Sequence, residues 1–289
     1  MRNLKELNLL KTRFLAEYDP AYAGLEITRR DLTTQSLRRH DIIAGFEQFC
    51  NGVKRCFVEL IIQGIVKAFE LIVTFDPEVL GITWLSLKIS GTATFISLFI
   101  GVSIGTAVAL NNFFGKRFVI SLINTGMGLP PVVVGLFVTM MIWRSGPFGF
   151  LEILYTPYAM IIAQAIIATP IVMGISLAAI QNLSPNLRLQ ILSLGASRLQ
   201  MVWVLIKEAR LPLLAAVMAG FGGVISEVGA SIMVGGNIKG YSRVLTTATV
   251  METGKGNFDV AIALGIILLL LSFIVNYLLT QIQQRQRSR

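Results

Sequence analysis

Glu227 is the residue with the clearest capacity for chemistry in the apolar part of this sequence. It is the only charged residue in the stretch 211–234. A carboxylate in so apolar a segment is costly in lipid, and it usually faces other helices or a water-filled cavity. We therefore expect a specific role for Glu227, either in a mechanism or as a hydrogen-bonding group between helices.

Other residues that commonly carry catalysis or bind metals are scarce. Cys50 and Cys56 have a C-x5-C spacing that matches no zinc or redox motif, and we expect both to be free thiols. His40 is the only histidine, so neither a histidine metal site nor a Ser-His-Asp triad can be assembled among the apolar segments. The chain also lacks a G-x-x-x-x-G-K-[ST] nucleotide-binding loop. We predict no catalytic residue, no metal site and no cofactor bound by this chain.

The elements that position these residues are membrane-spanning helices. Hydrophobic residues make up 54% of the 289 and charged residues only 14%. A helix needs about 20 apolar residues to cross the hydrocarbon core, and lipid offers the backbone no hydrogen-bond partner outside the helix. We predict an all-α fold, a polytopic bundle of about five core helices. The predicted spans are Ile89–Leu110, Phe118–Trp143, Tyr158–Ile180, Leu211–Val234 and Val260–Leu279.

Prolines and polar residues interrupt two of these spans. Pro130-Pro131 and Thr169-Pro170 should kink their helices, because proline removes a backbone donor and frees a carbonyl to face a cavity. Gln164, Thr169 and Ser226 could line a polar path, although helix packing explains each of them equally well.

The N-terminal region differs in composition from the rest. Residues 1–57 are polar and basic, whereas residues 58–75 place Glu59, Gln63, Lys67 and Glu70 on one side of a helix that is otherwise apolar. This pattern predicts an interfacial amphipathic helix. Five spans and a cytoplasmic C-terminus would place this basic segment outside the cytoplasm, whereas basic segments favour the cytoplasmic side. Three explanations stay open: a sixth span at 58–75, translocation of the segment, or a true start near Val58. We favour the late start, which leaves residues 1–57 out of the mature protein.

Basic loop residues predict the topology. They are concentrated after the first span, between the third and fourth spans, and after the last span, which places these loops and the C-terminus in the cytoplasm. The net charge of +9 is explained by these loops and does not require nucleic acid as a partner.

The cytoplasmic loop 184–210 has the pattern of two helices joined by a turn. Ser184 and Pro185 form a helix-start signal, with the serine as the N-cap, and Gly195 supplies the turn. Leu194, Leu199, Val202, Trp203 and Ile206 then give the loop an apolar surface, which packs either on its own bundle or on a partner.

This loop resembles the EAA loop of ABC importer permeases, whose short coupling helix docks on the ATPase subunit. The resemblance covers roughly residues 80–285, although Leu189-Gln190-Ile191 replaces the E-A-A triplet and Lys207-Glu208 replaces the first L-P pair. It implies that the permease domain is 58–289 and that ATP is hydrolysed by a partner subunit. The residues implied for ATPase coupling are Leu194, Gly195, Ala196, Ser197, Arg198, Val202, Trp203 and Pro212.

A second segment, from Glu227 to Ile238 and on through Thr247, resembles tungstate importer permeases, relatives of the molybdate and sulfate permeases. The resemblance implies two copies lining the path, an extracytoplasmic binding protein, and a bacterial or archaeal cytoplasmic membrane. The residues that we assign to the path or gate are Glu227, Gly229, Ser231, Gly235, Gly236, Asn237, Lys239 and Arg243.

Within this interpretation, Glu227 would repel an anion in the path, so we favour its hydrogen-bonding role. Lys239 and Arg243 either attract the oxyanion or contact the binding protein or solvent. Molybdate and sulfate remain alternative substrates. A secondary transporter would need coupling-ion sites and related halves, and a membrane enzyme would need a nucleophile-base pair or metal ligands. Neither set of features is present in the predicted spans.

Overall fold

Every regular element that the structure describes is a helix, as the hydropathy predicts. The structure is a computed structural model of the chain, and it describes residues 58–287. The predictions for residues 1–57, including His40, Cys50, Cys56 and the late start, lie outside the described residues.

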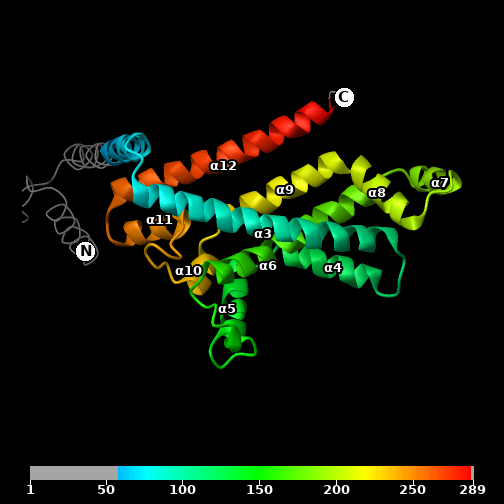
Figure 1. Cartoon of the computed structure of the whole chain (residues 1–289), viewed down its shortest axis with the longest axis horizontal. Helices are drawn as coiled ribbons and strands as arrows, with labels where there is room; N and C mark the ends of the chain where they lie inside the picture. Colours follow the sequence, from blue (N-terminus) through cyan, green and yellow to red (C-terminus); the bar gives the residue numbers. More distant parts are fainter. Residues whose placement is uncertain (1–57, 288–289) are drawn as a thin grey trace, which may run out of the picture. The chain divides into compact units, whose positions relative to one another are not determined.

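The bundle is built from spanning helices joined by short elements (Figure 1). A first helix at residues 58–73 precedes α3. The elements that follow are α3 (Pro77–Leu110), α4 (Lys116–Met127), α5 (Pro131–Ile142), η2 (Gly149–Leu151), α6 (Pro157–Gln181), α7 (Pro185–Ser193), α8 (Arg198–Glu208), α9 (Arg210–Ile225), α10 (Gly229–Gly235), α11 (Leu245–Gly254) and α12 (Phe258–Arg287).

Two of the five predicted spans are bent pairs of helices rather than single helices. In the described residues α3, α6 and α12 are long and apolar enough to cross a membrane singly, and there are up to five spans if each bent pair counts as one. The predicted span Phe118–Trp143 turns by 100° between α4 and α5. The predicted span Leu211–Val234 turns by 61° between α9 and α10. The prolines predicted an interruption of the first of these spans but not its angle, and nothing predicted the bend in the second, because hydropathy detects apolar length and not a change of direction.

The break between α4 and α5 has a direct cause in the sequence. Gly128 ends α4, and Pro130 and Pro131 follow as the N-cap and first residue of α5. Proline has no N–H to donate to the preceding turn, so α4 cannot continue through this point. The predicted kink is therefore a complete break, whereas α6 continues through Pro170 as one helix.

Helix α6 lies against α3 along much of its length and also contacts α4 and α9. Small residues allow the close approach of α3. A Cβ atom at Gly101 would lie 2.9 Å from Cβ of Val172, and one at Gly105 would lie 2.7 Å from the Met173 carbonyl oxygen. Ser97 Oγ also donates a hydrogen bond to the Ala165 carbonyl, at 3.1 Å. The contact between α3 and α6 is thus the most extensive helix pairing of the described residues.

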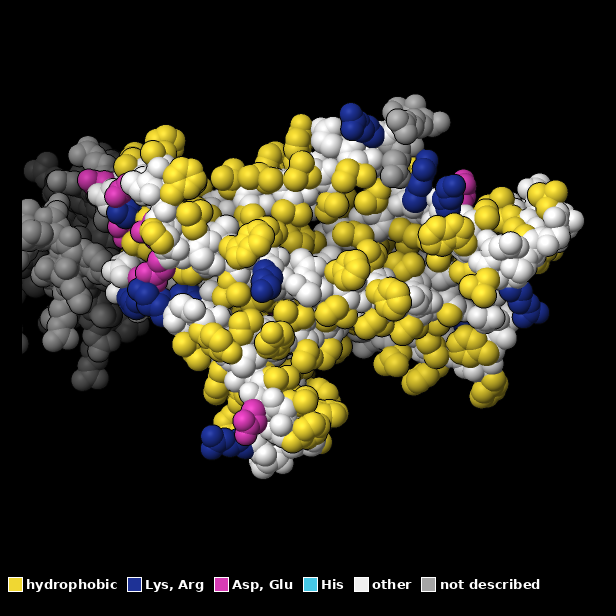
Figure 2. Space-filling model, in the orientation of Figure 1, with side chains coloured by type: hydrophobic (Ala, Val, Ile, Leu, Met, Phe, Trp, Pro, Cys, Tyr) yellow, Lys and Arg dark blue, Asp and Glu magenta, His cyan; other side chains and the backbone are white. Residues whose placement is uncertain are grey.

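Charged side chains gather toward the ends of the bundle, and the surface between them is mostly apolar (Figure 2). At the end of α11, outside the candidate spans, Glu252 accepts hydrogen bonds from Lys255 Nζ at 2.8 Å and from Asn257 Nδ2 at 2.7 Å. The Lys255 bond, followed by the Asn257 bond, lowers the pKa of Glu252.

Candidate coupling surface and translocation path

The predicted loop 184–210 is the hairpin formed by α7 and α8, at the end of the bundle away from α11 (Figure 1). Pro185 is the first residue of α7 as predicted, but the side chain of its N-cap, Ser184, makes no capping hydrogen bond. The capping serine is instead Ser197, which forms a capping box with Gln200 at the start of α8. Gly195 has φ +81°, a left-handed conformation that favours glycine, and it makes the turn.

One side of this hairpin is fixed to the bundle. Ile191, Met201 and Leu205 are buried with the end of α6 and the start of α9. Arg188 Nη1 donates to the Leu110 carbonyl at 3.1 Å, and this satisfies one of the carbonyls left free where α3 ends. The hairpin is therefore held at a defined position.

The other side of the hairpin is exposed and apolar. The exposed fraction is 87% for Leu194, 84% for Leu199 and 69% for Trp203. Of the predicted apolar surface, Val202 and Ile206 instead pack partly into the bundle, because they lie on the same side of α8 as Leu205. Exposed leucine and tryptophan side chains beside polar ones make this side of the hairpin a candidate docking surface.

Among the other predicted coupling residues, Ala196 packs partly into the same cluster and Arg198 is exposed at the first turn of α8. Pro212 is exposed in the first turn of α9. Its missing N–H falls where a helix has no acceptor for it. The hairpin thus brings together most of the predicted coupling residues, while Pro212 lies just beyond it.

The two broken helix pairs meet at their second halves. A Cβ atom at Gly135 of α5 would lie 2.6 Å from Cα of Ala230 in α10. A Cβ atom at Gly229 would lie 2.5 Å from Cγ2 of Val132. Both distances are too short for a side chain at the glycine, so α5 and α10 pack closely here, with Gly135 against the backbone of Ala230 and Gly229 against the side chain of Val132.

Glu227 lies at the break between α9 and α10. Its Oε1 accepts a hydrogen bond from the Ala230 backbone N–H at 3.0 Å, and its carbonyl accepts one from Thr246 Oγ1 at 3.1 Å. The carboxylate thus stands at the N-terminal end of α10, where the helix leaves N–H groups without partners and the helix dipole favours negative charge. The half-buried side chain thus caps α10, while the backbone carbonyl of the same residue is bonded to α11.

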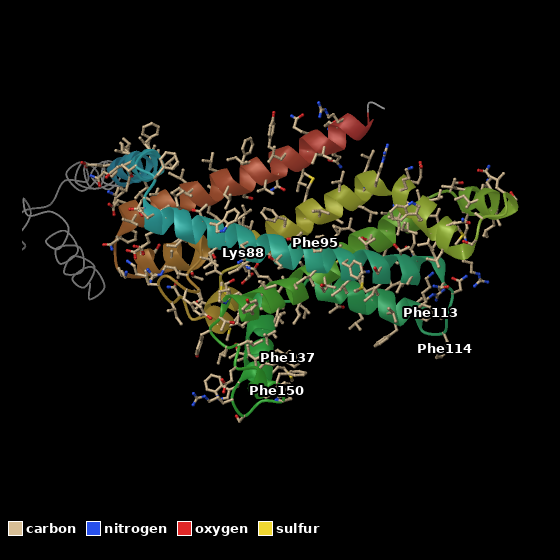
Figure 3. The ribbon with its side chains drawn as sticks, in the orientation of Figure 1. Lys88, Phe95, Phe113, Phe114, Phe137 and Phe150 are labelled. Atoms are coloured by element: carbon tan, nitrogen blue, oxygen red, sulfur yellow. The ribbon has the colours of Figure 1, made fainter. Side chains whose placement is uncertain are left out.

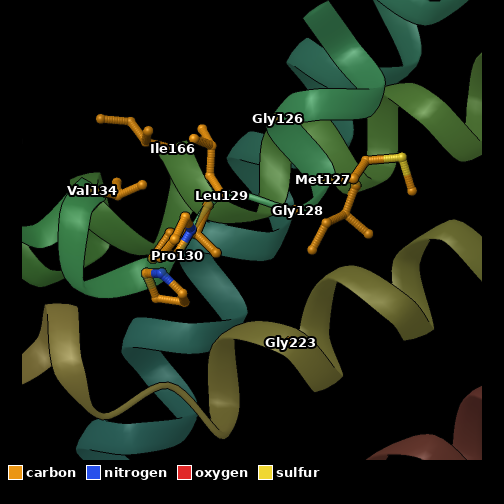
Figure 4. Close-up of a pocket in the computed structure, with 11 residues that line it drawn as sticks. Gly126, Met127, Gly128, Leu129, Pro130, Val134, Ile166 and Gly223 are labelled. Carbon is orange, nitrogen blue, oxygen red and sulfur yellow. The ribbon is translucent and has the colours of Figure 1, made fainter. Parts of the chain in front are cut away.

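A pocket of about 310 Å³ opens beside the α4–α5 break, between that break, α6 and α9 (Figure 4). Its wall contains no charged side chain, and the backbone is accessible at its glycines. The lining residues are Gly126, Met127, Gly128, Leu129, Pro130, Pro131, Val134, Ile166, Ile167, Ile171 and Gly223. The sequence assigned none of these residues to a site, although it predicted that Pro130 and Pro131 kink the helix and free carbonyls to face a cavity. The run Gly126-Met-Gly-Leu-Pro-Pro131 was the signal that marked this break.

Several predicted path residues are packing points between α6 and α10 and do not line this pocket. Ser231 is buried and accepts a hydrogen bond from Gln164 Nε2 at 3.3 Å. A Cβ atom at Gly235 would lie 2.6 Å from Sδ of Met160. Gly236 and Asn237 end α10 with φ of +69° and +51°. They turn the chain into the loop that follows.

The two predicted cations of that loop have an acidic partner that the sequence did not reveal. Lys239 Nζ lies 2.7 Å from one Glu78 carboxylate oxygen, and Arg243 Nη1 lies 3.6 Å from the other. Glu78 is in the first turn of α3, far from both in the sequence. The loop is therefore tied to α3, and one negative charge faces two positive ones.

The chain is similar in sequence to transporter permeases. Residues 97–288 match the family model described as the binding-protein-dependent transport system inner membrane component. The chain is 40% identical over 227 residues to the tungstate uptake system permease protein TupB of Peptoclostridium acidaminophilum, which covers 78% of this chain and 100% of that protein. It is 34% identical over 226 residues to TupB of Campylobacter jejuni, covering 78% and 95%.

Solved structures share the fold at low identity. A bacterial ABC transporter that imports alginate matches with a TM-score of 0.65 at 18% identity, over 84% of this chain and 93% of that chain. The MetNI methionine ABC transporter matches with a TM-score of 0.59 at 18% identity, over 70% and 93%.

Proposed function

Because the chain belongs to the family of binding-protein-dependent transport system inner membrane components, we propose that it is the permease subunit of an ABC importer for tungstate. The observation that supports tungstate as the substrate is the 40% identity over the full length of a tungstate uptake permease. Molybdate is the second candidate, because molybdenum transport permeases are related at 26% identity. Sulfate follows, since one relative at 26% identity is a sulfate permease.

In this proposal ATP is hydrolysed by a separate ATPase subunit that binds the exposed side of the α7–α8 hairpin. Leu194, Leu199 and Trp203 supply an apolar contact, and Gly195 holds the turn between the helices. The hairpin and the C-terminus then lie on the cytoplasmic side, as the basic residues of these segments favour. The rigid attachment through Arg188 and Leu205 would transmit movement of the ATPase to α3, α6 and α9.

The path for the anion runs along the α4–α5 break. An oxyanion in the pocket there would meet backbone at Gly126, Gly128 and Gly223 and no carboxylate. A path needs binding weak enough for release, and an uncharged wall provides this. Glu227 acts as the cap of α10 beside the path. Affinity and selectivity are supplied by an extracytoplasmic binding protein, for which the Lys239–Arg243 loop is the docking site.

A second copy of the chain completes this path. Helix α5 and η2 form an arm that leaves the bundle (Figure 1). Large apolar side chains are exposed along it, including Phe137 at 58% and Phe150 at 77% (Figure 3). The exposed Arg144 and Glu152 lie at the tip of the arm. These charges would be costly in lipid, so the arm fits the surface of a second permease better than it fits acyl chains.

Reconstitution tests this function. The permease, its ATPase and its binding protein are placed in liposomes, and uptake of labelled tungstate is measured with molybdate and sulfate as competitors. We expect uptake that requires both ATP and the binding protein, and unlabelled tungstate, added as a third competitor, should inhibit it more strongly than molybdate or sulfate. Uptake that persists without the ATPase would instead indicate a secondary transporter. Stronger competition by molybdate would reassign the substrate.

A further inference from the structure

Helix 58–73 has three distinct faces, although an ordinary surface helix has two. The first face packs on the bundle. Ala68 is 2% exposed, Leu71 packs against the cluster that contains Ile82 and Leu264, and a Cβ atom at Gly64 would lie 2.4 Å from Cγ2 of Ile262. The helix is therefore docked on the beginnings of α3 and α12.

The second face is apolar and exposed. Its side chains recur every three or four residues, so they form one stripe along the helix. Exposed fractions are 54% for Ile62, 61% for Val66, 70% for Phe69 and 57% for Val73. Four exposed apolar side chains in one stripe require an apolar environment.

The third face is polar and lies between the other two. It consists of Glu59, Gln63, Lys67 and Glu70, all of them spaced by three or four residues. Lys67 Nζ pairs with Glu70 Oε2 at 3.0 Å, and 54% of the Glu70 side chain remains exposed. A stripe that faces lipid beside a stripe that faces water is the pattern of a helix lying in a membrane interface.

The orientation and depth of the helix agree with this pattern. Figure 1 views residues 58–73 nearly end-on, whereas α3 and α12 run across the picture, so the helix lies across the spans rather than along them. Its contacts Ile82 and Ile262 lie about 6–8 Å from the ends of α3 and α12, at 1.5 Å per residue. The charged residues Glu78 and Glu252 are at the same end of the bundle.

Exposed residues of α3 mark the same level. Trp84 is 68% exposed, and Lys88 is an exposed cation one turn further along (Figure 3). Tryptophan is enriched where hydrocarbon meets headgroups, and lysine extends its ammonium group toward lipid phosphate from just below that level.

We propose that helix 58–73 lies in the plane of the membrane and binds phospholipid of the leaflet opposite the α7–α8 hairpin. The Phe69 stripe contacts acyl chains, and the Gln63 face contacts headgroups and water. Because its first face packs on α3 and α12, the helix fixes this end of the bundle in the leaflet. The proposal does not depend on the identity of the transported anion.

Spin labelling of the full chain in phospholipid nanodiscs tests the proposal. Single cysteines replace Phe69, Gln63 or Ala68 in a background in which Cys50 and Cys56 are serine. We expect the label at Phe69→Cys to collide more with oxygen than with a water-soluble nickel chelate. The Gln63→Cys label should show the reverse, and the Ala68→Cys label should be immobile.

Three outcomes would overturn the proposal. A Phe69→Cys label that is accessible to nickel would place the stripe in water. Dipolar broadening between labels at this position would assign the stripe to a second copy. A label there that neither reagent reaches would mean that other protein covers it. Because a failed Ala68 variant would leave the other two labels readable, the test survives poor folding of that one variant.

Discussion

Substitutions of Glu227 can distinguish a role in capping helix α10 from a direct role in anion transport. Glu227→Gln keeps the oxygen that accepts from the Ala230 N–H at 3.0 Å and removes only the charge. The interaction of that charge with the helix dipole is about 0.3–1 kcal/mol, which changes the population of formed α10 by at most about fivefold. Glu227→Ala also removes the acceptor, which costs about 0.5–2 kcal/mol and reaches about thirtyfold at its upper limit.

Both variants are assayed at matched expression by thermal unfolding in detergent and by ATP-driven anion uptake. We expect Glu227→Gln to retain at least about a fifth of wild-type uptake, and Glu227→Ala to be less stable and less active. Complete loss of uptake in Glu227→Gln, with normal stability and normal retention of the ATPase, would refute the cap. The carboxylate would then act in transport itself.

Three further predictions concern packing, coupling and pH. Gly105→Leu should lower the unfolding midpoint, because its Cβ atom would lie 2.7 Å from a backbone oxygen and overpacking costs about 1–3 kcal/mol. The control is Gly91→Leu on the same helix, where a Cβ atom meets nothing within 4 Å. Equal unfolding midpoints for the two variants would contradict this packing. Trp203→Ala should reduce the amount of ATPase that is retained on purification, without changing the stability of the permease. Trp84→Ala, at an equally exposed tryptophan at the other end of the bundle, should leave ATPase retention unchanged. Equal losses of ATPase in the two variants would exclude a specific contact at Trp203. The pKa of Glu252 is lowered in the folded state, so its stabilisation is present above the unfolded pKa and disappears as pH falls through the folded pKa. Glu252→Gln should therefore lower the unfolding midpoint at pH 7 but have little effect at strongly acidic pH, and a pH-independent difference would contradict the ion pair.

The features that the sequence predicts correctly are those set by local chemistry. The all-α class follows from apolar length and is confirmed by the described residues. The family is confirmed by the match over residues 97–288. The break at Pro130 follows from the missing N–H of proline, and the turn at Gly195 from its backbone freedom.

The features that the sequence could not reveal depend on direction and on distant contacts. Apolar spans do not record the 100° turn that carries α5 out of the bundle. The pairing of Lys239 with Glu78 joins segments far apart in the chain. Likewise, Val202 and Trp203 are neighbours in one amphipathic pattern, but only the structure shows that the first packs inward and the second is exposed.

Coupling of a partner ATPase to an anion path through the α7–α8 hairpin can be tested with a single variant, by measuring tungstate uptake of Gly195→Asp at wild-type expression. Gly195 has φ +81° and open space around it, so aspartate strains the backbone of the turn without a clash. We expect loss of ATP-driven uptake, with the permease still in the membrane but no longer bound to its ATPase. Unchanged ATP-driven uptake would contradict this coupling.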